Sequence, residues 1–293
     1  MRVRLRGIFP PVPTSFDAAG DVDVRAIAAN VTRLMSTGLS GVLALGSNGE
    51  AASLDEAESD RILAAVRAVV PASKVLIAGT GRESTRSTID ACHRAAAIGA
   101  DVVLVRPPSY YKSQMTSDAL VSHFRSVADA SPAPVMLYNL PATGVTLTLP
   151  VVSTLAAHPN IVGLKETSPE LERLGQFAEI GEGFRVLTGW APVLLPALAM
   201  GAAGGILAVA NVLPDQTVRL FDHATAGRQT EALALQRALT PIARLVSSVY
   251  GVAGLKAALD LAGFHGGPVR APLLSVSDRE RDDIARTLSA VPR

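Results

Sequence analysis

Eight short apolar segments recur along the chain, and this repetition restricts the possible folds more than any other feature of the sequence. Each segment lacks the polar alternation of a half-exposed strand and is typical of a strand buried on both faces. The expected strands are residues 7–12, 41–45, 75–78, 101–105, 135–138, 161–165, 184–187 and 206–210, and the expected helices are residues 23–35, 55–69, 84–98, 117–130, 150–157, 170–180 and 192–200. This alternation predicts an α/β fold, a parallel (β/α)8 TIM barrel rather than an open doubly wound sheet.

The chain beyond residue 226 follows a different pattern. It contains three helical stretches, near residues 228–249, 253–262 and 278–290, and no further strand. We therefore expect the barrel to occupy residues 1–226. Residues 227–293 are expected to form a helical appendage and not a second catalytic domain.

Composition excludes several classes of protein. The net charge is +1 with acids and bases interspersed, so neither nucleic acid nor an acidic membrane surface is an expected partner. A single cysteine, Cys92, cannot form an intramolecular disulfide and fits a reducing compartment. Pro10, Pro11 and Pro13 interrupt the apolar run behind the basic amino terminus, which argues against a signal peptide. These features predict a cytoplasmic protein.

Residues 186–214 carry no charged side chain and are long enough to span a bilayer. The stretch contains Pro192, Pro196 and Asn211, and its character changes midway from helical to strand-like. A buried helix followed by a buried strand is favoured over a transmembrane helix.

Lys165 is one of only four lysines in the chain, and it ends the apolar segment of residues 160–165. Desolvation at such a position favours the neutral amine, which is a nucleophile toward carbonyl carbon. The position therefore suits Schiff-base chemistry. The alternative from the residues alone is a strand-end lysine that pairs with Glu166 or reaches solvent.

Functional groups of a TIM barrel lie at the carboxyl ends of its strands and in the loops that follow. Lys165 and Tyr138 end neighbouring expected strands, so their side chains can converge. A phenol near a carbinolamine can relay protons during imine formation, and a hydroxyl such as that of Ser47 can bridge two phenols. The side chains expected at this end of the barrel are Ser47, Tyr110, Tyr138, Lys165, Thr167, Trp190 and Asn211.

The loop of residues 46–50 has the sequence Gly-Ser-Asn-Gly-Glu, and its amides could bind a carboxylate or a phosphate. It lacks the ending of a P-loop, and residues 79–81 lack the third glycine of a dinucleotide fingerprint. Taken alone, the loop is better explained as a tight turn in which Glu50 caps a helix.

The histidines show no metal-ligand spacing. His93, His123, His158 and His223 fall in expected helices or at their ends. This distribution argues against divalent-metal chemistry, so neither a metal nor another cofactor is expected.

Four segments occur in the order and spacing of a known family: Gly46-Ser47-Asn48-Gly49-Glu50, Tyr138-Asn139-Leu140-Pro141, Gly163-Leu164-Lys165-Glu166 and Ala210-Asn211-Val212. Together they resemble the dihydrodipicolinate synthase/N-acetylneuraminate lyase superfamily, over residues 7 to about 274. The resemblance implies a (β/α)8 barrel with a carboxy-terminal helical bundle, assembled as a homotetramer (a dimer of dimers). It also implies class I chemistry, in which a lysine forms a Schiff base with pyruvate or another 2-keto acid without a metal.

The same resemblance assigns catalytic roles to individual residues. It implies that Lys165 forms the imine and that Tyr138 relays protons. Ser47 and Asn48 match the pair that holds the carboxylate of the keto acid. Tyr110 matches a tyrosine that completes the hydroxyl relay, in many members across a subunit boundary.

Three further positions match the family near the substrate. The carbonyl of Ile206 matches the one that faces bound pyruvate, and Thr167 matches a polar position beside it. Gly189 matches a substrate-site glycine after which sialic acid lyases place acidic residues; here Trp190 follows. The site therefore lacks the acidic side chains that would bind a polyhydroxy substrate tail.

Departures from the family patterns indicate a subfamily. Dihydrodipicolinate synthases carry an arginine shortly after the Tyr-Asn-x-Pro segment, and residues 141–144 contain none. Residues 46–50, 109–112, 250–256 and 266–272 are most similar to 4-hydroxy-2-oxoglutarate aldolases. The expected function is reversible aldol cleavage of a 4-hydroxy-2-keto acid to pyruvate and an aldehyde. Alternatives are a dihydrodipicolinate-synthase-like condensation, a 2-keto-3-deoxy sugar acid aldolase or dehydratase, and a non-catalytic keto-acid-binding regulator.

Overall fold

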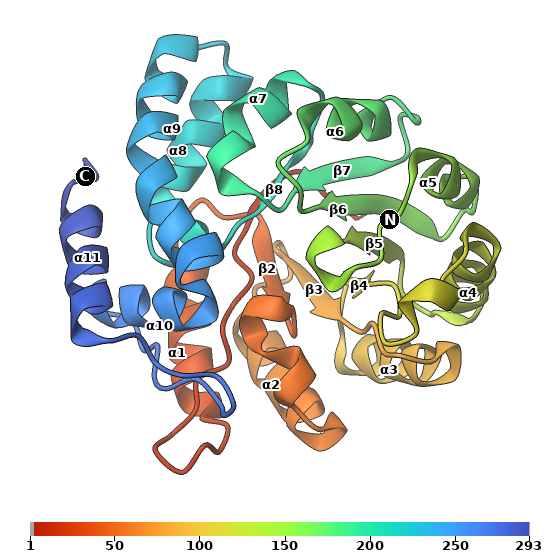
Figure 1. Cartoon of the computed structure of the whole chain (residues 1–293), viewed down its shortest axis with the longest axis horizontal. Coiled ribbons are helices and arrows are strands. Elements are labelled where there is room, and N and C mark those ends of the chain that lie inside the picture. The colour runs from red at the N-terminus through yellow and green to blue at the C-terminus, as the bar shows by residue number, and fades with distance from the viewer. Residues whose placement is uncertain (1–2, 293) are drawn as a thin grey trace.

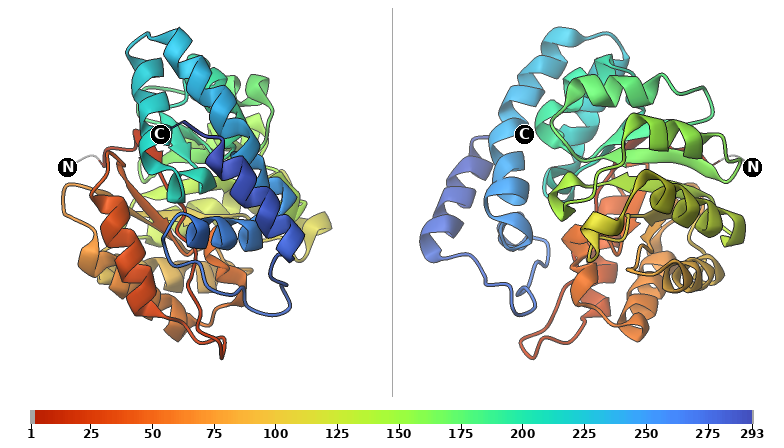
Figure 2. Two further views of the ribbon diagram at one scale, coloured as in Figure 1. Left: turned by 90° about the vertical axis from the view of Figure 1, so that its left-hand side faces the viewer. Right: turned by 45° about the vertical axis from the view of Figure 1, so that its right-hand side comes forward.

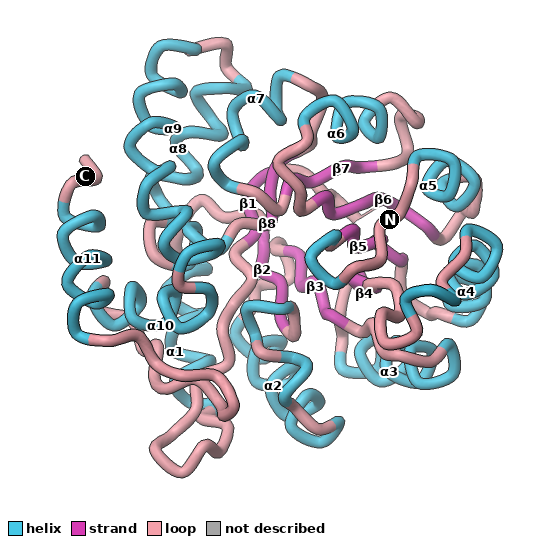
Figure 3. Tube along the Cα trace, viewed as in Figure 1, coloured by secondary structure: helices cyan, strands magenta, loops and turns pink. Residues whose placement is uncertain are grey.

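The computed structural model describes residues 3–292 and shows eight parallel strands ringed by helices (Figures 1 and 3). The strands are β1 (Gly7–Phe9), β2 (Gly41–Ala44), β3 (Val75–Gly79), β4 (Val102–Val105), β5 (Val135–Asn139), β6 (Ile161–Glu166), β7 (Arg185–Thr188) and β8 (Gly204–Ile206). Their hydrogen-bonded order is β1-β8-β7-β6-β5-β4-β3-β2. A parallel bridge between Pro11 and Leu43 joins the β1 and β2 ends of this sheet, so the predicted (β/α)8 barrel is confirmed.

Helices follow the strands around the outside of the barrel and continue beyond it. The α-helices are α1 (Val24–Met35), α2 (Glu56–Val69), α3 (Thr85–Ile98), α4 (Ser117–Ala130), α5 (Leu149–Ala156), α6 (Leu171–Ala178), α7 (Leu194–Ala199), α8 (Pro214–Thr225), α9 (Gln229–Arg244), α10 (Gly251–Leu261) and α11 (Asp278–Ser289). Short 3-10 helices are η1 (Ser47–Gly49), η2 (Ala51–Ser53), η3 (Lys112–Gln114), η4 (Pro141–Thr143), η5 (Ala191–Val193) and η6 (Ala208–Asn211), and η7 (Leu245–Val249) is a π-helix.

The side chains of each strand alternate between two apolar layers. On β5, Met136 and Tyr138 point into the barrel, whereas Val135 and Leu137 pack outward against the helices. This alternation follows from the two-residue repeat of a strand. The interior is therefore a packed core of apolar side chains.

The eighth strand differs from its prediction. The sequence predicts a strand over residues 206–210, but β8 spans Gly204–Ile206 and η6 occupies most of the predicted range. A Cβ at Gly204 would lie 1.9 Å from the carbonyl oxygen of Gly7 on β1, so only glycine permits this approach of the two backbones. Because glycines form much of this strand, it lacks the apolar run by which the other strands are recognised.

The first strand is shorter than predicted. Residues 7–12 are expected to be extended, but β1 ends at Phe9. Pro10 and Pro11 follow it and carry no N–H group to donate to a ladder. The carbonyl of Pro10 still accepts a hydrogen bond of 2.9 Å from the Leu43 amide, which holds this segment beside β2.

The chain after α8 is helical and packs on one side of the barrel (Figure 2). α9 lies along α8, α11 contacts α9 and α10, and α10 also contacts η1, the turn that follows β2. The uncharged residues 186–214 form most of β7, the helices η5 and α7, β8 and η6. Within residues 3–292, no helix combines the length and the apolar character needed to cross a bilayer.

Candidate active site

Lys165 and Tyr138 lie opposite each other on adjacent strands at the carboxyl end of the barrel. In the β5–β6 ladder Tyr138 pairs with Lys165, because an irregularity between Val135 and Met136 moves the register by one residue. Without that shift Tyr138 would face Leu164, which points outward. The side chains of Lys165 and Tyr138 instead meet inside the barrel, where Lys165 Nζ lies 4.2 Å from the centroid of the Tyr138 ring.

Glu166 takes no part in this contact, because successive residues of a strand point to opposite faces. Its carboxylate is fully buried outside the barrel. There it accepts hydrogen bonds from Asn139 Nδ2 at 2.7 Å, from the Ser168 amide at 2.9 Å and from Arg173 Nη2 at 3.2 Å. The alternative that Lys165 is a structural partner of Glu166 is therefore wrong.

The four lysines have different surroundings. Lys74 Nζ donates to the carbonyls of Thr37 and Leu39, Lys256 forms a buried ion pair, and Lys112 is exposed. Lys165 is 3% exposed and, among residues 3–292, has no carboxylate or carbonyl partner. Lys165 is thus the buried lysine whose amine is not bound by a carboxylate or a carbonyl oxygen.

Tyr138 is held by polar groups on several sides. Its hydroxyl lies 3.4 Å from Ser47 Oγ. Burial alone would raise the pKa of the Tyr138 phenol, but the Lys165 ammonium and the neighbouring Ser47 hydroxyl outweigh burial and hold this pKa below its usual range. A phenol with a lowered pKa gives up its proton more readily, which suits a proton relay.

Thr167, Gly189 and Ile206 line the same end of the barrel. Thr167 Oγ1 is buried and has no hydrogen-bond partner among the described residues. A Cβ at Gly189 would lie 2.4 Å from Thr167 Oγ1 and 3.0 Å from Lys165 Cε, so glycine leaves room for both side chains. Ile206 packs in the interior core with Tyr138. The structure therefore brings these three predicted residues to the Lys165 end of the barrel.

The loop after β2 forms η1 and presents Ser47 and Asn48 near Tyr138. Ser47 is exposed and Asn48 is half-buried, so both remain accessible to a ligand. Leu45 and Glu50, on either side of residues 46–49, have positive φ angles of 59° and 52°. Such backbone conformations are costly for residues with a side chain and concentrate at functional sites.

Glu50 does not cap the helix that follows this loop. The cap of α2 is Asp55, whose side chain forms a reciprocal capping box with Glu58. The Glu50 carboxylate instead lies 2.5 Å from Lys256 Nζ and accepts a 2.9 Å hydrogen bond from the Arg270 amide. The interpretation of Glu50 as a helix cap is therefore wrong.

Tyr110 is not part of the Ser47–Tyr138 contact within one chain. Its side chain is 78% exposed and stacks edge-to-face on Tyr111 with ring centroids 5.0 Å apart. The backbone at this turn is nevertheless fixed, because the amides of Ser109 and Tyr110 both donate to Glu83 Oε2. A relay role for Tyr110 stays a prediction that requires a second subunit.

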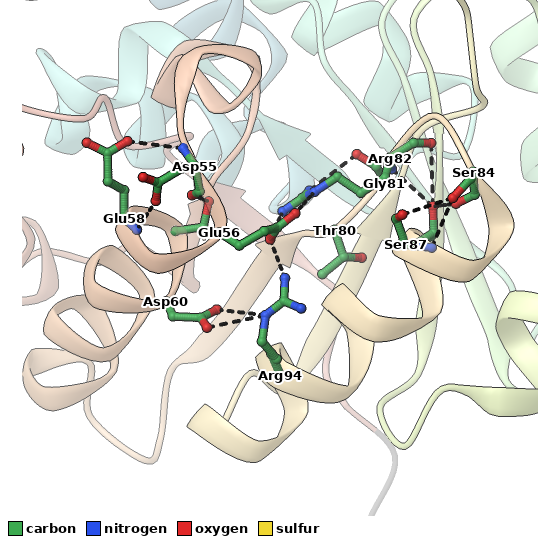
Figure 4. A network of polar contacts seen from close by, with 12 residues as sticks. Asp55, Glu56, Glu58, Asp60, Thr80, Gly81, Arg82, Ser84, Ser87 and Arg94 are labelled. Atoms are coloured by element: carbon green, nitrogen blue, oxygen red, sulfur yellow. Dashed lines mark hydrogen bonds and ion pairs between the residues drawn. The ribbon is translucent and has the colours of Figure 1, made fainter.

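Three arginines on this side of the barrel are already paired with carboxylates. Arg82, just beyond β3, reaches Glu56 of α2 with contacts of 2.8 and 2.9 Å, and Arg94 joins Glu56 to Asp60 (Figure 4). Arg106, just after β4, lies 2.8 Å from Glu83. These pairs tie neighbouring elements together and leave fewer cations for a ligand.

Residues 3–292 contain no cluster of three or more His, Cys, Asp or Glu side chains arranged to hold a metal ion. His123 is buried between helices, where its Nδ1 lies 2.9 Å from Thr85 Oγ1. His158 is paired with Asp129 at 2.9 Å. Metal-independent chemistry remains a prediction.

Sequence reasoning did not identify Glu50, Lys256 and Arg270 as a buried polar group beneath the mouth loop. Their separation along the chain leaves no local signal, since Glu50 and Arg270 lie 220 residues apart. The only hint is that all three occur within the segments by which the chain resembles a known family.

Comparisons with known proteins cover nearly the whole chain. Residues 4–291 match the family model described as the dihydrodipicolinate synthetase family. A probable mitochondrial 4-hydroxy-2-oxoglutarate aldolase of Emericella nidulans is 39% identical, covering 94% of this chain and 91% of the relative. A 4-hydroxy-tetrahydrodipicolinate synthase of Methanothrix thermoacetophila is 36% identical, covering 97% and 96%.

Solved structures show the same similarity. YagE of E. coli K12, a prophage protein of the dihydrodipicolinic acid synthase family solved in complex with pyruvate, is 30% identical with a TM-score of 0.92, covering 99% of each chain. The dihydrodipicolinate synthase DapA-2 of Bacillus anthracis is 28% identical with a TM-score of 0.94, covering 99% of this chain and 100% of the other.

Proposed function

Since this chain belongs to the dihydrodipicolinate synthetase family, we propose that it is a class I lyase that forms a Schiff base between Lys165 and a 2-keto acid. The proposed reaction is the reversible cleavage of a 4-hydroxy-2-keto acid to pyruvate and an aldehyde. Family membership itself gives aldolase or synthase chemistry; the imine and the substrate are the proposal.

One observation carries the proposal. Lys165 is 3% exposed, and its amine lies beside the Tyr138 ring and has no anionic partner among the described residues. A primary amine that no anion holds is available to attack a carbonyl carbon. Tyr138 and Ser47 supply hydroxyls at the same point, which supports proton transfer to and from the attacked oxygen.

The proposed steps use only these side chains and the substrate. Lys165 Nζ attacks C2 of the keto acid, and the carbinolamine loses water as a proton passes through Tyr138 to the departing oxygen. The resulting iminium withdraws electrons, and the C3–C4 bond breaks as the Tyr138 phenolate takes the proton of the 4-hydroxyl. The aldehyde leaves, C3 of the enamine is protonated, and water then hydrolyses the imine to release pyruvate and the free amine.

The amides and side chains of Ser47 and Asn48 are assigned to the keto acid carboxylate. They lie at the start of a turn whose backbone is bent by positive φ angles on both sides. Exposed amides in such a turn bind anions well. Thr167 Oγ1, buried without a partner, is assigned to a polar group of the bound substrate.

The aldehyde is proposed to be small and to carry a carboxylate, as in the cleavage of 4-hydroxy-2-oxoglutarate to pyruvate and glyoxylate. The identity to the Emericella protein supports this choice. The absence of an arginine in residues 141–144 argues against the condensation catalysed by dihydrodipicolinate synthases, although a relative with that name is 36% identical. A 2-keto-3-deoxy sugar acid aldolase or dehydratase remains the next alternative, and a non-catalytic regulator is disfavoured because Lys165, Tyr138 and Ser47 converge.

Borohydride trapping tests the proposal. Pyruvate plus borohydride should add a stable mass to the peptide that contains Lys165, and Lys165→Ala should abolish both the label and turnover while the barrel stays folded. Label on Lys74, Lys112 or Lys256 would refute the assignment. Turnover is then measured with 4-hydroxy-2-oxoglutarate, and in the condensation direction with glyoxylate and with aspartate semialdehyde; preference for the semialdehyde would favour the synthase alternative.

Three further expectations accompany this function. The imine mechanism needs no metal, so turnover should survive prolonged chelation; loss restored by zinc or magnesium would contradict it. A homotetramer is proposed from the family resemblance, and it would bring a partner's tyrosine toward the site. A cytoplasmic location stays a prediction, and the Emericella relative is named as mitochondrial.

A further inference from the structure

The loop that presents Ser47 and Asn48 is bound at its end by residues of the carboxy-terminal region. The Glu50 carboxylate, at the end of this loop, lies 2.5 Å from Lys256 Nζ on α10. Both side chains are only 1% exposed. The same carboxylate accepts a hydrogen bond of 2.9 Å from the Arg270 amide. Both partners of Glu50 therefore come from beyond the barrel.

The ion pair is enclosed by further contacts of the same segment. Lys256 Nζ also donates to the Pro268 carbonyl at 2.6 Å and lies 4.4 Å from the centroid of the Phe16 ring. The Arg270 guanidinium lies 4.3 Å from the same ring centroid. It also donates to the Ser53 carbonyl at 2.8 Å, at the far end of the loop. The carboxy-terminal region thus holds residues 50–53 at both ends.

The backbone of Glu50 explains why this anchoring matters for the loop. Its φ angle of 52° lies in the left-handed region, which a glutamate adopts only when its surroundings hold it there. Thr14 Oγ1 additionally donates to the Gly49 carbonyl at 2.6 Å. The direction of the Ser47 and Asn48 amides is thereby set before any ligand arrives.

We propose that the Glu50–Lys256 ion pair is a positioning device for the carboxylate-binding loop, through which the carboxy-terminal helices set the affinity for the keto acid. This inference rests on the proposed function, in which Ser47 and Asn48 bind the substrate carboxylate. Neither Glu50 nor Lys256 touches the substrate in it. A pre-organised loop binds more tightly because it loses less freedom on binding.

The experiment measures the pyruvate concentration that gives half-maximal borohydride trapping, together with the melting temperature. Lys256→Met and Glu50→Gln each leave one buried charge unpaired, so both should lower the melting temperature and raise half-saturation about tenfold or more, a factor that corresponds to about 1.4 kcal/mol. Lys74→Met is the matched control, because Lys74 is bound to two carbonyls at the amino end of β3. It should lower the melting temperature and leave half-saturation unchanged.

The double variant Glu50→Gln/Lys256→Met decides between positioning and mere stability. It buries no unpaired charge, so its melting temperature should recover relative to the single variants. If the pair positions the loop, the pyruvate concentration for half-maximal trapping should stay above the wild-type value in this well-folded double variant. Recovery of both quantities to wild-type values would overturn the inference. The inference would also be overturned if the wild type is trapped and the pyruvate concentration for half-maximal trapping is the same in all variants. If no 2-keto acid traps the wild type, the proposed function is overturned, and this inference with it.

Discussion

Lys165 Nζ lies 4.2 Å from the centroid of the Tyr138 ring because the two residues face each other across the β5–β6 ladder. The contact depends on the register shift between Val135 and Met136 in the same ladder. Without this shift, Tyr138 would pair with Leu164, whose side chain points outward. The proposed nucleophile and the proposed proton relay are therefore fixed by backbone pairing and not by a flexible loop. Groups on paired strands keep their geometry when the substrate is absent.

Removal of the Tyr138 hydroxyl should reduce turnover without unfolding the barrel. Tyr138→Phe keeps the ring in the interior core but removes the relay, so kcat should fall by ~10²–10⁴-fold, the usual worth of a positioned acid–base group. Ser47→Ala should also slow turnover, because its hydroxyl lies 3.4 Å from that of Tyr138. Tyr250→Phe is the control. The Tyr250 hydroxyl donates a 3.1 Å hydrogen bond to Asp283 and lies outside the barrel interior.

The melting temperatures of these variants distinguish a relay from a packing role. Tyr138→Phe and Ser47→Ala each delete one hydroxyl and create no cavity, so both should melt close to the wild type. A packing role would give the reverse pattern, with stability lost and turnover per folded molecule unchanged.

A methyl group at Gly189 should displace the lysine. In Gly189→Ala the added Cβ would lie 3.0 Å from Lys165 Cε and 2.4 Å from Thr167 Oγ1, so one or both side chains must move. Misplacement of a reacting group by about 1 Å can cost ~10²-fold, and the rate of borohydride trapping should fall by about that factor. Gly183→Ala is the control, because no atom lies within 4 Å of a Cβ there. Equal trapping rates for the two variants would show that Gly189 does not confine Lys165.

Much of the fold and part of the site could be predicted from the sequence, for identifiable reasons. Strands buried on both faces leave continuous apolar runs, and Lys165 ends one of them. β8 escapes this rule because its glycines allow close backbone contact and carry no apolar side chain. The Glu50–Lys256 pair escapes it because contacts between residues far apart in the chain leave no periodic pattern. The environment of Tyr110 could not be predicted, since its side chain is mostly exposed and stacks on the adjacent Tyr111.

Lys112 should contribute to recognition of the aldehyde. Residues 141–144 lack an arginine, but Lys112 Nζ, from the turn after β4, would lie 3.0 Å from a Cβ at Gly144 in this loop. Because the loop follows β5 at the carboxyl end of the barrel, the ammonium can meet a carboxylate on the incoming aldehyde. Lys112→Met should therefore raise KM for glyoxylate about tenfold, the loss of roughly one exposed charged contact.

Pyruvate provides the internal control for the Lys112 variant. Half-saturation for borohydride trapping with pyruvate should not change, because that carboxylate is assigned to Ser47 and Asn48. KM for an uncharged aldehyde should not change either. If pyruvate binding and glyoxylate binding weaken by the same factor, Lys112 acts through its general charge near the barrel mouth, and a specific contact with the aldehyde is contradicted.

Burial of His123 should make the protein less stable in acid. Desolvation lowers the pKa of this imidazole from 6.5 to about 4, and its Nε2 is buried without a partner among the described residues. Between these two values the unfolded chain binds a proton at this site that the folded chain does not, so unfolding is favoured as the pH falls. The loss begins below about pH 6.5, grows by about 1.4 kcal/mol per pH unit at most, and stops near pH 4.

His123→Asn isolates this contribution, because an amide does not titrate and can still contact Thr85 Oγ1. Urea unfolding of both proteins at matched concentration, from pH 7.5 to 4.5, gives the two stability curves. The variant should be the less stable protein at pH 7.5, where the neutral imidazole fills its site. Its stability should then fall less steeply, so that by pH 5 the difference between the two has moved in the variant's favour by about 2 kcal/mol. Parallel curves would show that His123 is protonated as readily in the folded protein as in the unfolded chain, and that its burial imposes no penalty on the imidazolium.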